Sequence, residues 1–390
     1  MRSSANAVLR VTAATLLVVL SACGALPEGE FDAATIAPLV YNDQVVTVED
    51  ARAHKADTDL LAVTPTMREF VEQYTAGMHN PRSRLLSLHT AVKSPGGLDM
   101  EYDPFADGSA QDAFRRGTAN CLSYANLFVA LAREAGLDAR YQWIDIRPEW
   151  QRVGDRVAVR LHVNVLVKTR HGEDFMIDID PLRRHEVAGS RILSDREAEA
   201  LYYGNLAMQS LSEDDVARAW MQTVQGLEIA PELSHLWVNL GAIYRYAEQY
   251  VAAEQTYFRA LSVDRTDRSA MNNLVVLYEM TGREEEEAYW LDRLHRYRLN
   301  NPYYHANLGD IAGAEGDWDA AFDHYSKAVK LHPNDSELIY GLGLIEHRRG
   351  NYDAATSWIE KAIEEANFTV DERNYRIQLR ELRKQRAASL

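Results

Sequence analysis

The spacing of hydrophobic positions changes along the chain and predicts three kinds of structure. From about residue 65 to residue 136, apolar side chains recur three or four positions apart, which is typical of helices. After Gly136 the apolar and polar residues alternate, which predicts strands. From about residue 200 the helical spacing returns and continues to the C-terminal region. The chain therefore contains a mixed region followed by an all-helical one.

The mixed region predicts a helix packed on an antiparallel sheet. A run of apolar residues at helical spacing begins at Cys121, and Gly136 is a typical C-terminal stop for that helix. The turn "TRHGED" (169–174) joins two alternating segments in a hairpin. The expected fold class is α+β, and we place this domain at 46–195. The predicted strands cover 139–147, 157–167 and 173–180.

The helical region repeats with a period of 34 residues. Leu206, Leu240, Leu274, Leu308 and Leu342 keep this spacing, and a small residue follows each of them except Leu274. The pattern resembles the tetratricopeptide repeat, in which small residues lie where two helices cross closely. This resemblance implies an all-α solenoid closed by a polar capping helix at 371–387. We place five repeats within 200–369, at 200–233, 234–267, 268–301, 302–335 and 336–369.

The N-terminal segment has the features of an export signal. Arg2 is followed by an apolar run over 11–20, about half the roughly 20 residues that a membrane-spanning helix needs. The tetrad Leu-Ser-Ala-Cys that ends at Cys23 resembles the lipobox of bacterial lipoproteins. That resemblance implies a signal peptide at 1–22, a lipid on Cys23 and a tether over 23–45. With Gly24 after the cysteine, it implies the periplasmic side of the outer membrane. The alternative is an ordinary cleaved signal with an incidental cysteine.

Composition and charge narrow the functional classes. The chain has 46% hydrophobic and 26% charged residues, and its net charge of −16 argues against nucleic acid or an anionic membrane surface as the main partner. Its twelve histidines are dispersed without a His-Glu-x-x-His run, so we expect no metal and no cofactor. With two cysteines in all and a lipid on Cys23, Cys121 has no thiol left to pair with.

The unpaired Cys121 can be interpreted as a nucleophile. At the start of a helix, free backbone N–H groups and the helix dipole favour a thiolate. His162 lies within a predicted strand and Asp178 on the next one, so the three side chains could meet as nucleophile, base and orienting group. Asp180 points to the same face as Asp178 and is the alternative orienting group. Taken singly, each residue also has a structural interpretation, such as a small buried thiol.

The order of these residues resembles the transglutaminase-like fold of papain-type thiol enzymes. The resemblance covers about residues 60–185 and rests on "GTANCLSYANLFVALAREAGLDARY", "LHVNV" and "IDIDP". It implies that Cys121 is the nucleophile, His162 the base and Asp178 the orienting residue. No cofactor is implied.

Two positions depart from the family pattern close to these residues. Family members often have an aromatic residue two positions after the histidine, where this chain has Asn164. The glycine that usually lies close before the cysteine is four positions away, at Gly117. We expect the backbone N–H of Cys121 to supply part of an oxyanion hole, with a geometry that differs from the family's.

A second series of polar residues follows the repeat period. Asn205, Asn239, Asn273 and Asn307 precede the repeated leucines, and Gly341 breaks the series. By resemblance, this position faces the concave groove, where amides could pair with the backbone of an extended peptide. The alternative is that asparagine serves packing or capping at this position.

Two functions follow from these patterns. The first is a lipid-anchored periplasmic thiol enzyme, a cysteine peptidase, amidase or acyltransferase, that acts on a peptide or protein amide recruited by the repeats. The second is a repeat-based adaptor lipoprotein whose transglutaminase-like module is inactive and only binds.

Overall fold

The computed structural model describes residues 31–55, 59–146, 161–168, 174–180, 187–366 and 369–389. All elements discussed below belong to one compact unit, Ala33–Leu390. The expected signal peptide and Cys23 lie outside the described residues, as does most of the turn at 169–174. No helix in the described part of the chain is long and apolar enough to span a membrane.

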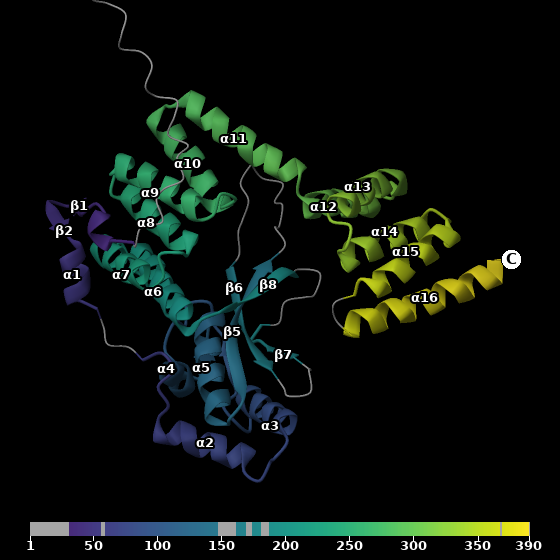
Figure 1. The fold of residues 1–390 in the computed structure, drawn as a ribbon, viewed down its shortest axis with the longest axis horizontal. Coiled ribbons are helices and arrows are strands. Elements are labelled where there is room, and N and C mark those ends of the chain that lie inside the picture. Colours follow the sequence, from purple (N-terminus) through teal and green to yellow (C-terminus); the bar gives the residue numbers. More distant parts are fainter. Residues whose placement is uncertain are drawn as a thin grey trace, which may run out of the picture. The chain divides into compact units, whose positions relative to one another are not determined.

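The sheet of the mixed region has four antiparallel strands in the order β7-β6-β5-β8 (Figure 1). The strands are β5 (Asp138–Ile146), β6 (Leu161–Lys168), β7 (Asp174–Ile177) and β8 (Val187–Leu193). Helix α5 (Cys121–Glu134) packs on β5 and β6. The predicted α+β fold is therefore confirmed, and β8 is a strand that the sequence pattern did not indicate.

Helix α5 forms the buried centre of this domain. Its residues from Leu122 to Ala132 are all buried, because it is covered by the sheet and by the smaller helices. Gly136 adopts φ +71°, a left-handed conformation that glycine tolerates well, and the chain enters β5 directly afterwards. The elements that precede α5 are α2 (Pro65–Thr75), α3 (Pro81–Lys93), β3 (Glu101–Tyr102), α4 (Ala110–Arg116) and β4 (Thr118–Ala119).

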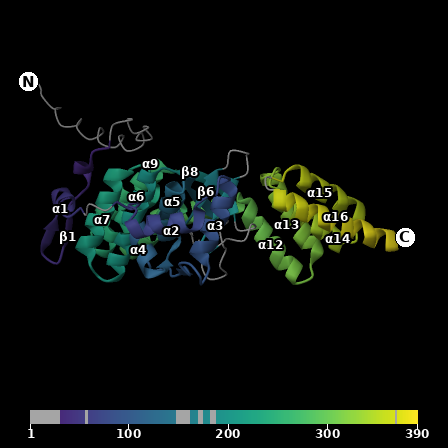
Figure 2. The ribbon, with the colours of Figure 1, turned by 90° about the horizontal axis from the view of Figure 1, so that it is seen from below.

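The C-terminal region is an array of helix pairs, as the repeat pattern predicts (Figures 1 and 2). The helices of two pairs cross closely at small residues: a Cβ on Gly241 would lie 2.4 Å from the ring of Tyr257, and one on Gly309 would lie 2.5 Å from Tyr325. The pairs are α6 (Asp195–Ser212) with α7 (Val216–Ile229), α8 (Ser234–Tyr246) with α9 (Tyr250–Val263), α10 (Arg268–Thr281) with α11 (Glu284–Leu299), α12 (Pro302–Ala314) with α13 (Trp318–Leu331), and α14 (Ser336–Arg348) with α15 (Tyr352–Glu364).

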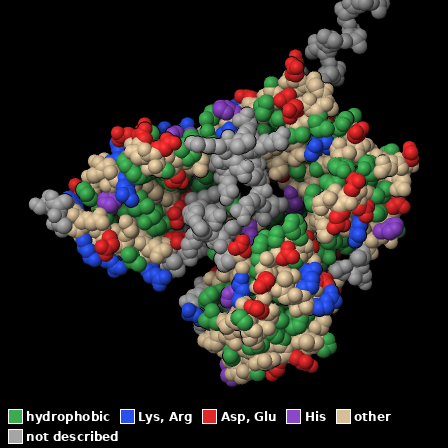
Figure 3. All heavy atoms as spheres, turned by 180° about the vertical axis from the view of Figure 1, so that it is seen from behind, with side chains coloured by type: hydrophobic (Ala, Val, Ile, Leu, Met, Phe, Trp, Pro, Cys, Tyr) green, Lys and Arg blue, Asp and Glu red, His purple; other side chains and the backbone are tan. Residues whose placement is uncertain are grey.

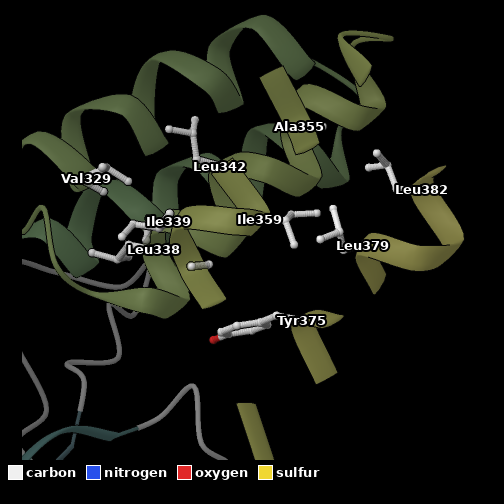
Figure 4. Close-up of a cluster of buried hydrophobic side chains, with 12 residues drawn as sticks. Val329, Leu338, Ile339, Leu342, Ala355, Ile359, Tyr375, Leu379 and Leu382 are labelled. Carbon is white, nitrogen blue, oxygen red and sulfur yellow. The ribbon is translucent and has the colours of Figure 1, made fainter. Parts of the chain in front are cut away.

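Helix α16 (Thr369–Ser389) covers the end of the array. Its Tyr375, Leu379 and Leu382 pack into the cluster that α14 and α15 form (Figure 4). The basic residues on its other side make ion pairs, including Arg376 with Glu372 at 2.7 Å. Acidic and basic side chains are likewise interspersed over the face of the molecule in Figure 3. The polar capping helix expected from the sequence therefore matches α16 in position and character.

Residues 33–53 are folded onto the first two repeats, where the sequence predicts a tether up to residue 45. Helix α1 (Val48–Ala53) lies beside α7 in both ribbon views (Figures 1 and 2). It follows a hairpin of β1 (Leu39–Tyr41) and β2 (Gln44–Val46), whose turn residues Asn42 and Asp43 have positive φ. Asn-Asp flanked by strand formers is a hairpin signal that identifies this segment in the sequence.

Polar contacts, one of them fully buried, fix the N-terminal segment to the repeats. Gln225 of α7 is 3% exposed, and its Nε2 donates to the backbone carbonyl of Ala51 at 2.5 Å. The Tyr244 hydroxyl donates to the carbonyl of Ala37, and Arg52 pairs with Glu228 at 2.7 Å. Because buried carbonyls need donors, these contacts tie the segment to one position on the array.

We expect Gln225→Ala to destabilise the protein by about 1–3 kcal/mol, since it leaves the Ala51 carbonyl buried without its donor. Urea unfolding followed by circular dichroism measures the change. Gln209→Ala, at an exposed position of α6, is the matched control and should change stability by less than about 0.5 kcal/mol. Equal stability of the two variants would show that the segment is not held by this contact.

Candidate active site

Cys121 is the first residue of α5 and remains partly exposed. Asn120 caps the helix, with its side-chain oxygen accepting from the Ser123 N–H at 2.8 Å. Gly117 ends α4 at φ +71°, and β4 then pairs with β3 and leads the chain into α5. The glycine four positions before the cysteine thus has a defined role, which is to end one helix so that the next can start.

His162 and Asp178 are in direct contact. The imidazole Nε2 lies 2.5 Å from Oδ2 of Asp178, and both side chains are about nine-tenths buried. His162 lies on β6 opposite Ile144, while Asp178 directly follows the end of β7. Because Nε2 bonds the carboxylate, Nδ1 is the nitrogen that remains for the sulfur of Cys121. The structure therefore brings together the residues that the sequence proposes as base and orienting group.

The electrostatics of His162 place all three side chains in one interacting group. Burial would lower the pKa of His162, but hydrogen bonds to Asp178 and Cys121, together with their negative charges, raise it to about 9. A histidine with this pKa is an imidazolium at neutral pH. Such a cation beside the sulfur stabilises a thiolate, which is the reactive form of cysteine.

The loop after β7 decides between the two candidate carboxylates. Asp180 is exposed, and its backbone N–H donates to Oδ1 of Asp178 at 3.2 Å. Asp178 therefore hydrogen-bonds the His162 imidazole through Oδ2 and accepts a backbone N–H on Oδ1. The geometry favours Asp178 as the orienting group and gives Asp180 a supporting position.

Lys93 is a neighbour of this site that the sequence analysis did not identify. Its Nζ donates to the backbone carbonyl of Ile179 and lies 5.7 Å from the ring centroid of Tyr124. Burial lowers the pKa of Lys93, while the charges of Asp178 and Asp180 act in the opposite direction. The ammonium group thus holds the backbone next to Asp178. No local pattern identifies it, because Lys93 reads as an ordinary basic residue in the last turn of a helix.

The asparagine series of the repeats is engaged in contacts within the protein at two of its four positions. Asn205 donates to Asp107 at 3.1 Å, and Asn273 donates to the carbonyl of Ser269 at 2.9 Å. The peptide-binding role predicted for Asn205, Asn239, Asn273 and Asn307 stays a prediction.

The comparison with known families agrees with this geometry. Residues 68–174 match the Transglutaminase-like superfamily, and residues 236–270 and 307–368 match tetratricopeptide repeats. The chain carries a transglutaminase-like domain followed by tetratricopeptide repeats. Repeats of this kind imply that the protein binds another protein or a peptide. The transglutaminase-like match ends at residue 174, before Asp178, so the contact of Asp178 with His162 is an observation from the geometry alone.

Similar proteins match this chain only in part. The TPR repeat-containing protein MJ1428 of Methanocaldococcus jannaschii is 23% identical over 33% of this chain and 22% of its own length. Superkiller protein 3 of Saccharomyces cerevisiae is 22% identical over 43% of this chain and 12% of its own length. The chain thus spans less than a quarter of these curated relatives.

Two solved structures are also similar to part of the chain. YrrB, described as a TPR protein with an unusual peptide-binding site, has 19% identity and a TM-score of 0.24, covering 45% of this chain and 91% of YrrB. PilF of Pseudomonas aeruginosa has 17% identity and a TM-score of 0.26, covering 50% of this chain and 88% of PilF.

Proposed function

We propose that the transglutaminase-like domain is a thiol enzyme that cleaves or exchanges an amide in a peptide or protein, with Cys121 as nucleophile. The observation that carries this proposal is the position of His162, which bonds Asp178 at 2.5 Å and whose pKa is raised by hydrogen bonding to both Asp178 and Cys121. A buried thiol that served packing alone would need neither partner.

The first half of the reaction forms an acyl-enzyme. The Cys121 thiolate attacks the amide carbonyl carbon, a carbon–sulfur bond forms, and the oxygen becomes negatively charged. The backbone N–H groups at the start of α5 lie where they can stabilise this oxyanion. The His162 imidazolium then gives its Nδ1 proton to the leaving nitrogen, the carbon–nitrogen bond breaks, and a thioester remains on the enzyme.

The second half restores the thiol enzyme. Water or an amine attacks the thioester carbonyl and gives its proton to Nδ1 of His162, which is now neutral. The carbon–sulfur bond breaks, and the thiolate and imidazolium are regenerated. Asp178 keeps the ring oriented and stabilises its positive charge throughout both halves.

The repeats suggest how the substrate is bound, and the N-terminal signal suggests where the enzyme is located. We propose that the repeat groove recruits the peptide or protein, in line with the binding role that tetratricopeptide repeats imply. We further propose that lipid on Cys23 anchors the protein to the periplasmic side of the outer membrane. The lipobox-like tetrad before Gly24 supports this location.

Trapping the acyl group distinguishes this enzyme from the adaptor. The full chain is incubated with a mixed peptide digest and hydroxylamine, which attacks thioesters and converts the acyl group to a hydroxamate. We expect hydroxamate peptides when hydroxylamine is present, an acyl adduct on Cys121 in the mass spectrum when it is left out, and neither product with Cys121→Ala. If the wild-type protein binds peptides from the digest but yields neither product, the module is an adaptor.

A further inference from the structure

One carboxylate joins the start of the catalytic helix to the first repeat. Oδ1 of Asp107 accepts from Nδ2 of Asn120 at 2.6 Å and from Nδ2 of Asn205 at 3.1 Å. Asn120 is 5% exposed and caps α5 immediately before Cys121, while Asn205 lies on α6, the first helix of the repeat array. Asp107 therefore contacts both parts of the protein through the same oxygen.

The loop that carries Asp107 is fixed on the catalytic helix and on the sheet. The carbonyl of Ala106 accepts from the Asn120 N–H at 3.2 Å, and the carbonyl of Gly108 accepts from Nδ2 of Asn126 at 3.0 Å. Oδ1 of Asn126 accepts in turn from the Tyr141 hydroxyl on β5 at 2.8 Å. Because the loop bonds Asn120 through both Ala106 and Asp107, a shift of the loop would move Asn120, the residue that precedes Cys121.

The Asp107 carboxylate also affects the charge balance at the helix start. The helix dipole attracts a negative charge near the N-terminal end of a helix. A carboxylate already held there repels a second negative charge, here the thiolate of Cys121. The side-chain amide of Asn205 donates a hydrogen bond to that carboxylate and so stabilises its negative charge. A change in the contact between Asn205 and Asp107 therefore alters both the geometry and the electrostatics around the thiolate.

We propose that Asn205 is a positioning residue that, through Asp107, couples the first repeat to the start of the catalytic helix. This inference rests on the proposed function. It distinguishes Asn205 from Asn273, which lies at the same repeat position and donates to the carbonyl of Ser269 in its own helix. A ligand that shifts α6 thereby changes the reactivity of Cys121 without touching it.

Acylation of Cys121 by p-nitrophenyl acetate tests the coupling, because this small acyl donor needs no recruitment by the repeats. We expect Asn205→Ala to slow acylation by about tenfold, within the range that a small displacement of a catalytic group produces. Gln209→Ala, which removes an exposed amide from the same helix α6, is the control and should react at the wild-type rate. Equal rates for both variants would overturn the coupling.

Substitutions at both Asn205 and Asp107 distinguish the positioning role of Asn205 from a role in packing alone. Asn205→Asp places two carboxylates against each other and should react more slowly than Asn205→Ala. Combined with Asp107→Asn, it removes this repulsion, keeps an amide oxygen for Asn120 and offers the amide nitrogen to the new carboxylate, so the double variant should react faster than Asn205→Asp alone. A double variant no faster than Asn205→Asp would contradict the proposal. If wild-type Cys121 is not acylated at all, the proposed function itself fails.

Discussion

His162→Ala should slow the acylation of Cys121 by p-nitrophenyl acetate at neutral pH by about 10²- to 10⁴-fold. The ring hydrogen-bonds with Cys121, and as an imidazolium it stabilises the thiolate. The variant loses both effects, so its thiol reacts as an ordinary cysteine. The release of p-nitrophenolate gives the rate, and the mass of the intact protein gives the site of acylation.

The matched control for this substitution is His79→Ala. His79 is exposed and precedes α3 in the same domain. It should react at the wild-type rate. Equal acylation rates in His162→Ala and the wild type would show that the sulfur and the ring do not act together, and the catalytic proposal would be withdrawn.

Asp178→Asn should move the alkaline limit of turnover of a peptide p-nitroanilide, whose leaving nitrogen must be protonated, from about pH 9 toward the ordinary histidine pKa of 6.5. The release of p-nitroaniline measures this turnover. The carboxylate is among the groups that raise the pKa of His162, and an amide supplies no negative charge in its place. At pH 6 both proteins hold an imidazolium and differ least. Between pH 6.5 and 9 the variant loses its general acid while the wild type keeps it, so the difference is largest there.

Folding stability should change in the same pH range. The pKa of His162 is raised in the folded protein, so the interaction of His162 with Asp178 adds to the free energy of unfolding. This contribution is fully present below pH 6.5 and is lost as pH rises through about 9. Urea unfolding at pH 6 and pH 9 measures this loss, which should be smaller in Asp178→Asn than in the wild type.

Asp180→Asn is the matched control for the orienting carboxylate. It removes a charge two residues away but leaves the 2.5 Å contact between His162 and Asp178 in place. Its alkaline limit should stay within about half a pH unit of the wild type. If Asp180→Asn moved the limit and Asp178→Asn did not, the alternative orienting residue would be the correct one.

Regular spacing in the sequence was sufficient to predict most of the helices and the three strands β5, β6 and β7. The alternation over 139–147 predicted β5, and the apolar spacing after Cys121 predicted α5 with its end near Gly136. The 34-residue period predicted the helix pairs and their close crossings at Gly241 and Gly309. These predictions succeed because the side-chain period of a helix or strand is a local property of the backbone.

The sequence failed at elements whose stability comes from distant parts of the chain. The hairpin and helix α1 within residues 39–53 are short, and they are held by contacts such as that of Gln225 with Ala51, 174 positions apart. A short segment of this kind has too few apolar positions to show a period, so the sequence predicts a tether up to residue 45 and assigns 46–53 to the mixed domain. The turn residues Asn42 and Asp43 were the available signal.

The sequence by itself determined the residue types of the site and their order along the chain: a thiol at a helix start, a histidine in a strand and a pair of aspartates at the end of the next strand. The tertiary structure decided that Asp178 rather than Asp180 meets the imidazole, that Lys93 bonds the carbonyl of Ile179, and that Asn205 bonds Asp107, 98 positions away. A period of two gives both aspartates the same face, so only the path of the chain after β7 separates them. Hydrogen bonds between distant segments depend on how whole elements pack, which no local pattern contains.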